Sequence, residues 1–165
     1  MKGFRATRSG ISATFDAQEA GLLADLATQV ATLITGRGDG AGDPVLRRLF
    51  PAAYRDDEQN AEEFRRFTEE ELADDKVGNA LSIASTLTTP ARDGAKDDRV
   101  RVTLDDAAAF AWLRSLTDIR LALATRLGIE TEESVPPTDD ESRYTFAVYS
   151  WLGELQYSLV RAVDR

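Results

Sequence analysis

Two residue types on which much protein chemistry depends, cysteine and histidine, are missing from this 165-residue chain. Without cysteine these residues can form no disulfide, thiolate nucleophile or thiol redox switch. Without histidine they lack the commonest general base and the commonest transition-metal ligand. No G-x-S-x-G motif is present, and nothing singles out one pair of carboxylates for acid–base chemistry. We therefore expect a protein that is not an enzyme and that holds no cofactor and no metal ion.

Long apolar segments are also missing, and the charge is mostly of one sign. No run approaches the roughly 18 apolar residues of a membrane span. The opening residues, "MKGFRATRSG", carry early charges but no apolar segment, so they do not have the pattern of a signal peptide. The net charge of −9 disfavours nonspecific attraction to nucleic acid or to an anionic membrane. We expect a cytoplasmic protein that makes no membrane contact.

Alternating apolar residues predict a small sheet. Residues 3–15 read as a hairpin whose turn is Ser9 and Gly10, with Ile11, Ala13 and Phe15 on one face. Residues 99–104, "RVRVTL", alternate in the same way and predict a half-buried strand. An antiparallel sheet is therefore expected from the N-terminal hairpin and this later strand.

Capping boxes and helix-ending residues predict the remaining elements. Helices are expected at residues 16–36, 44–50, 57–67, 68–87, 105–128 and 138–165. The fold class is thus mainly α (α+β): a single-domain helical bundle over residues 1–165 with a small antiparallel sheet. Apolar residues make up 42% of the chain, which is enough to build its core.

Two of these helix starts depend on short capping patterns. Thr68 with Glu71 is expected to open a helix separate from the charged one before it, and Thr138 with Glu141 to open the last helix. For the helix over residues 68–87, the pattern predicts a buried stripe. Its expected members are Val77, Leu81 and Ala84, with Ala73 and Ala80 beside them.

Four arginines could form a basic surface on the sheet. If residues 99–104 pair with the hairpin, Arg5, Arg99 and Arg101 share its outer face, and Arg8 lies near the turn. Phosphate contacts of DNA need such a grouping, so these four are the candidate nucleic-acid contacts. The alternative is that charged residues on outer and edge positions only prevent aggregation of the sheet.

Arg120 occupies an unexpected position in the helix over residues 105–128. At 100° per residue it falls within about 40° of Leu113, Leu116 and Leu127, in the middle of the apolar stripe. Burying an unpaired charge is costly, so the guanidinium should bond a partner, and Gln156 and Asp74 are candidates. The alternative is that Arg120 extends to the edge of the bundle.

Aromatic residues surround more of the last helix than one bundle contact needs. Tyr144 and Trp151 lie to one side of its inner stripe, and Phe146 and Tyr157 lie to the other. Either the helix is central and enclosed by its own domain, or one aromatic flank is exposed. In the second case these four residues are a candidate interface for a homodimer.

Three longer blocks are similar to a known family. They are "TDIRLALATRLG", "VYSWLGELQYSLV" and "RLFPAAYRDDEQNAEEFRRFTEEEL". With them, nearly the whole chain resembles an actinobacterial AosR-type family, formerly a domain of unknown function, whose genes commonly lie beside the gene for ClpS, the adaptor of the Clp protease. The resemblance implies an oxidative-stress-responsive transcriptional regulator. Any thiol-based redox sensing in relatives cannot operate here, because the chain has no cysteine.

The resemblance favours a non-enzymatic regulatory protein. It would act on transcription through a protein partner, such as a sigma factor, or through DNA, which the net charge disfavours. The alternative is an interaction or adaptor protein associated with Clp proteolysis that does not bind DNA. Only the implied gene neighbourhood motivates this alternative.

Overall fold

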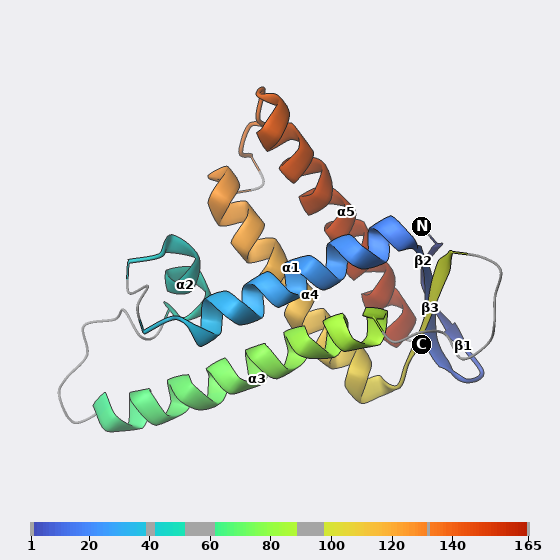
Figure 1. Ribbon diagram of the computed structural model, residues 1–165, viewed down its shortest axis with the longest axis horizontal. Helices are drawn as coiled ribbons and strands as arrows, with labels where there is room; N and C mark the ends of the chain where they lie inside the picture. The colour runs from blue at the N-terminus through green and yellow to red at the C-terminus, as the bar shows by residue number, and fades with distance from the viewer. Residues whose placement is uncertain (1, 39–41, 52–61, 89–97, 132, 165) are drawn as a thin grey trace.

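The computed structural model describes residues 2–38, 42–51, 62–88, 98–131 and 133–164. Three strands and five helices occur in these ranges (Figure 1). They are β1 (Lys2–Thr7), β2 (Gly10–Asp16), α1 (Ala17–Thr35), α2 (Pro44–Leu49), α3 (Glu62–Thr88), β3 (Arg99–Leu104), α4 (Asp106–Leu127) and α5 (Asp140–Val163). The predicted class is confirmed: a mainly helical chain with one small antiparallel sheet. Residues 57–61 of the expected charged helix lie outside the described residues.

The sheet has the predicted strands, in the order β1-β2-β3, with both pairs antiparallel. The predicted turn was wrong by one residue, because Arg8 and Ser9 form it and Gly10 already belongs to β2. Gly10 has a φ of +133°, and a Cβ there would lie 2.5 Å from the carbonyl oxygen of Leu104 on β3. Glycine is needed at this position because the backbone of β3 approaches so closely.

An aromatic cluster joins the inner face of the sheet to the helices. The ring of Phe4 meets the ring of Trp112 edge-on, with centroids 5.5 Å apart, and meets Phe15 in the same way at 6.1 Å. Ile11 and Phe15 are completely buried, as the alternation predicted. Burial of such large side chains is the main source of stability at this end of the fold.

Among the helices, α1 and α3 make the most extensive contact and run side by side (Figure 1). The capping box at the start of α1 is confirmed: Asp16 accepts from the backbone N–H of Glu19, whose carboxylate accepts from the N–H of Asp16. Gly36 ends the helix as predicted, but with a φ of −85° rather than a left-handed one.

The prediction of two separate helices around Thr68 was wrong, because α3 continues through this residue from Glu62 to Thr88. A capping pattern marks a helix start only where the preceding chain is not helical, and here it is. The predicted stripe was also wrong in part, since Leu81 is 49% exposed. The residues that α1 and α4 actually cover are Ala73, Ala80, Ile83 and Leu87.

Helices α4 and α5 pack against each other, and the C-terminal end of α5 also contacts β1 (Figure 1). Gly128 ends α4 in the left-handed conformation, with a φ of 70°, as predicted. The start of α5 is one residue later than expected, because Asp139 rather than Thr138 accepts from the N–H of Ser142, at 2.9 Å. None of the helices within the described ranges combines the length and apolar character of a membrane span.

Candidate functional site

The outer face of the sheet brings together two of the four predicted arginines. Arg5 on β1 lies opposite Ser12 of the central strand, and Arg101 on β3 lies opposite Thr14. Both line a shallow hollow of about 370 Å³, together with Lys2 and several hydroxyl groups. Lys2 was missed by the sequence reasoning, although it comes only three residues before Arg5 on the same strand.

The other two predicted arginines do not line this hollow. Arg8 is exposed in the hairpin turn, and Arg99 lies at the start of β3, opposite Asp16. Two of the four predicted arginines therefore lie together at the hollow, and the other two lie apart from it. Arg99 lies apart because the sheet register places it opposite Asp16 at the edge of the sheet. Whether any of these residues contacts nucleic acid stays a prediction.

The aromatic residues of α5 do not form one surface. Tyr144 and Tyr157 are exposed, but they lie about 20 Å apart along the helix and about 140° apart around it. Phe146 and Trp151 are half-buried: the ring of Phe146 lies 6.2 Å from that of Tyr149, and Trp151 packs against the core. Each predicted flank thus has one exposed ring, Tyr144 or Tyr157, and one half-buried ring, Trp151 or Phe146, and self-association stays a prediction.

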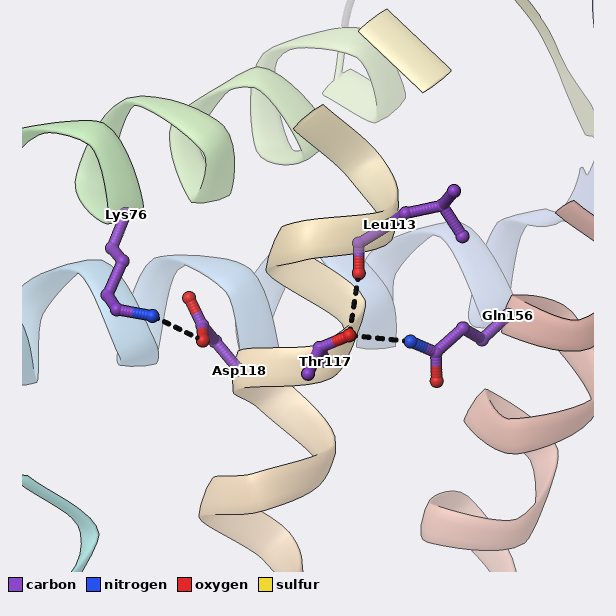
Figure 2. Close-up of polar contacts among 5 residues, drawn as sticks. All are labelled: Lys76, Leu113, Thr117, Asp118 and Gln156. Carbon is purple, nitrogen blue, oxygen red and sulfur yellow. Dashed lines mark hydrogen bonds and ion pairs between the residues drawn. The ribbon is translucent and has the colours of Figure 1, made fainter. Parts of the chain in front are cut away.

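Arg120 bonds one of its two predicted partners. Its Nη1 donates to Oε1 of Gln156 on α5 at 3.0 Å, whereas Asp74 is exposed on α3. The other end of the amide is fixed as well: Nε2 of Gln156 donates to the Thr117 hydroxyl at 2.6 Å, which donates to the carbonyl of Leu113 at 2.9 Å (Figure 2). This chain of bonds holds the amide with its oxygen towards the guanidinium.

The guanidinium of Arg120 is half-buried and packs against α5. Its Cζ lies 4.6 Å from the ring centroid of Tyr149, which is close enough for a cation–π contact. A Cβ at Gly153 would lie 3.2 Å from Nη2, so the lack of a side chain there makes room for the guanidinium. Nε is buried and has no hydrogen-bond partner among the described residues.

Sequence reasoning missed a second charged group on α4. Asp118 is buried, and its Oδ1 lies 2.7 Å from Nζ of Lys76 on α3 (Figure 2). Burial raises the pKa of Asp118 from its ordinary value of 3.8, and the hydrogen bond and charge of Lys76 oppose that rise. No clear signal for it was present in the sequence, because the burial of its neighbours Ser115 and Ile119 is seen only in the structure.

A cavity of about 550 Å³ opens beside Arg120, between α2, α4, α5 and the connection after α4. Its size is within the range of small-molecule sites. The lining combines cations, aromatic rings and hydroxyl groups, and its residues are Arg48, Thr117, Arg120, Leu121, Ala124, Ile129, Glu130, Thr131, Ser134, Phe146, Tyr149 and Gln156. The chain brings these together from positions up to 108 residues apart, Arg48 to Gln156.

The charge inside this cavity is unbalanced. Arg48 donates to the Ile129 carbonyl at 3.1 Å and to the Thr125 hydroxyl at 3.3 Å, and both acceptors are neutral. Neither Arg48 nor Arg120 has a carboxylate of the described residues within ion-pair distance. By contrast, Arg126, six residues after Arg120 on α4, pairs with Asp43 at 3.0 Å. In the described part of the chain, no group of three or more acidic residues could hold a metal ion.

A family model covers this arrangement almost completely. The model named "Domain of unknown function (DUF2017)" matches residues 1–163, which include the sheet, all five helices and the cavity. The chain belongs to the DUF2017 family. The resemblance noted from the sequence is thereby confirmed at the level of the family.

Curated relatives of this DUF2017 chain are mycobacterial proteins. A Mycobacterium leprae protein, whose name includes "oxidative stress regulator AosR", is 34% identical over 78% of this chain and 62% of its own length. The proteins named "Oxidative stress regulator AosR" from Mycobacterium bovis and Mycobacterium tuberculosis are each 31% identical over 80% of this chain and 63% of their own length. The DUF2017 chain thus spans less than two thirds of the relatives that it matches. No solved structure matches it significantly.

Proposed function

We propose that this protein is a non-enzymatic regulator in the response to oxidative stress, which acts on transcription by binding a protein of the transcription machinery, such as a sigma factor. The observation that carries the proposal is the similarity to relatives named as oxidative stress regulators. The absence of cysteine and histidine supports a role without chemistry of its own.

The charge distribution supports a protein partner rather than DNA. A net charge of −9 repels the phosphate backbone over most of the surface. The hollow on the sheet offers only Lys2, Arg5 and Arg101 against that repulsion. A stress signal would have to reach this chain by a route other than a thiol within its 165 residues.

Transcript profiling tests the regulatory role. A strain that lacks the protein is compared with the same strain complemented by the full chain, each before and after exposure to peroxide. We expect a set of transcripts that respond to peroxide only when the protein is present. Identical profiles in the two strains would contradict the proposal.

Binding measurements then separate the two modes of action. Fluorescence anisotropy with duplex DNA from responsive promoters gives the affinity of the purified protein, and pull-down from the native cytoplasm identifies protein partners. We expect no salt-dependent DNA binding at micromolar protein, together with recovery of a subunit or factor of RNA polymerase. Recovery of Clp components without any transcriptional effect would favour the adaptor alternative instead.

If DNA does bind, the sheet face can be tested directly. The double variant Arg5→Ala/Arg101→Ala removes both arginines of the hollow, and Arg143→Ala removes an exposed arginine at the far end of α5. Binding through the sheet predicts a salt slope lower by about two units in the double variant, about one per phosphate contact. A loss in Arg143→Ala about half that of the double variant, in proportion to the charges removed, would indicate an effect of net charge alone.

A further inference from the structure

The cavity beside α4 holds two cations, Arg48 and Arg120, for which the described residues supply no acidic partner. The chain has 29 acidic residues, and two other cations that lie on or against α4 do pair with them, Arg126 with Asp43 and Lys76 with Asp118. Arg48 and Arg120 instead bond neutral oxygens. Arg120 is half-buried, and a positive charge partly withdrawn from water without a counterion is costly, so an anion in the cavity would supply the opposite charge that Arg120 lacks.

Arg120 is held ready for such an anion. The bond to Gln156, the ring of Tyr149 and the close approach of Gly153 fix its guanidinium before any ligand arrives. Only one of its five N–H groups is used by a described residue, through Nη1. A donor fixed in advance binds more tightly than a free one, because less side-chain entropy is lost on binding.

Arg48 approaches the same cavity from α2. Its Nη1 is anchored on the carbonyl oxygen of Ile129, in the residue that follows Gly128 at the end of α4. The side chain is exposed, so it can adjust to a ligand, whereas Arg120 cannot. Glu130 is the one acidic residue in the lining, and its exposure weakens its repulsion of an anion by solvent screening.

The remaining lining is suited to an apolar body. Phe146 and Tyr149 present two rings from α5, and Leu121, Ala124 and Ile129 add aliphatic surface from α4 and the residues after it. A volume of about 550 Å³ has room for a molecule of one or two rings. Phosphate alone would leave this apolar surface uncovered.

We propose that this cavity binds a small organic anion, with its acidic group at Arg48 and Arg120 and an apolar or aromatic body against Phe146 and Tyr149. In a regulator, such a site would couple the level of a metabolite to partner binding. The binding itself does not depend on the regulatory role, because it can be measured on the purified protein.

A matched pair of probes tests the proposal. Anilinonaphthalene sulfonate has an anionic group on an aromatic body, and N-phenylnaphthylamine has the same body without the charge. Each is titrated into the purified full chain and followed by fluorescence. We expect the sulfonate to bind one saturable site about tenfold more tightly than the neutral amine, as one charged hydrogen bond would provide.

Charge-removing variants locate the site. Arg48→Gln and Arg120→Gln should each weaken the sulfonate about tenfold and change the affinity for the neutral amine less than about twofold. Arg161→Gln, an exposed arginine near the end of α5, removes the same charge away from the cavity and should leave the sulfonate affinity within about twofold.

Three results would overturn the proposal: no saturable sulfonate binding by the wild type, unchanged affinity in Arg48→Gln, or an equal loss in Arg161→Gln. Circular dichroism checks that each variant is folded. Because Arg48 is exposed, its variant decides the outcome even if Arg120→Gln does not fold.

Discussion

The two sides of α4 differ in whether a charged side chain has a partner of opposite charge. Towards α3, Asp118 is buried and meets Lys76 at 2.7 Å, so opposite charges neutralise each other in a closed interface (Figure 2). Towards α5, Arg120 meets the neutral amide of Gln156 and the ring of Tyr149, and it faces a cavity. In a structural ion pair the protein supplies both charges. In a binding site the protein supplies one charge and the ligand supplies the opposite one. The comparison thus separates a group that holds the fold from one that is available for binding.

The largest expected effect comes from breaking the pair on the α3 side. Lys76→Met leaves the Asp118 carboxylate buried without a counterion and should lower the free energy of unfolding by about 3 kcal/mol at neutral pH. Urea denaturation followed by tryptophan fluorescence measures this. The double variant Lys76→Met/Asp118→Leu removes both charges and should recover most of the loss. A single variant as stable as the wild type would show that the pair does not stabilise the fold.

Removing the charge on the α5 side should cost less. Arg120→Ala loses a hydrogen bond and a ring contact but leaves only a neutral amide behind, so we expect a loss of about 1–2 kcal/mol. The same urea titration applies. A loss larger than that of Lys76→Met would reverse the comparison and make Arg120 the main structural charge of α4.

The pH dependence of stability tests the α3 side, where Asp118 is the titrating group. Because the pKa of Asp118 is raised by burial, the folded protein keeps a proton there at pH values at which the unfolded chain has lost it. Wild-type stability relative to Asp118→Asn should therefore fall as the pH rises from 3.8 through the raised pKa. Urea midpoints across this range test the sign. A difference that grows in favour of the wild type would mean that pairing with Lys76 outweighs burial.

The smallest expected effect concerns Gly153. Alanine favours a helix over glycine by up to about 1 kcal/mol, but a Cβ at this position would lie 3.2 Å from Nη2 of Arg120. In the wild type the two effects should nearly cancel. In an Arg120→Ala background, Gly153→Ala should instead stabilise by about 0.5–1 kcal/mol. Equal effects in the two backgrounds, measured as a double-mutant cycle, would mean that Gly153 does not position the guanidinium.

Local patterns were sufficient for most of the elements. The alternation of residues 99–104 and the reciprocal contact of Asp16 with Glu19 specify structure within a few residues, and both are present as predicted. Thr68 with Glu71 has the same local pattern but lies inside α3, where the preceding turns are already helical. A pattern of this length cannot show whether the chain before it is helical, which explains the error.

The candidate site shows the same limit more clearly. The position of Arg120 in an apolar stripe predicted a partner, because a buried charge needs one, and Gln156 was one of the two candidates named beside Asp74. The role of Arg48 in the cavity could not be found in this way, since it is 72 residues from Arg120 in the sequence and shares no motif with it. Asp118 was overlooked because acidic residues are common in this chain and usually lie on the surface.

By itself, the sequence determined the capping box of α1, the strand alternation, the lack of thiol and imidazole chemistry, and the need of Arg120 for a partner. These follow from interactions between near neighbours or from the residues available. The tertiary structure alone decided which charges are neutralised: it placed Lys76 against Asp118 and left Arg48 and Arg120 facing one cavity. The physical reason is that electrostatic energy depends on distance and burial, and both are set by how distant helices pack.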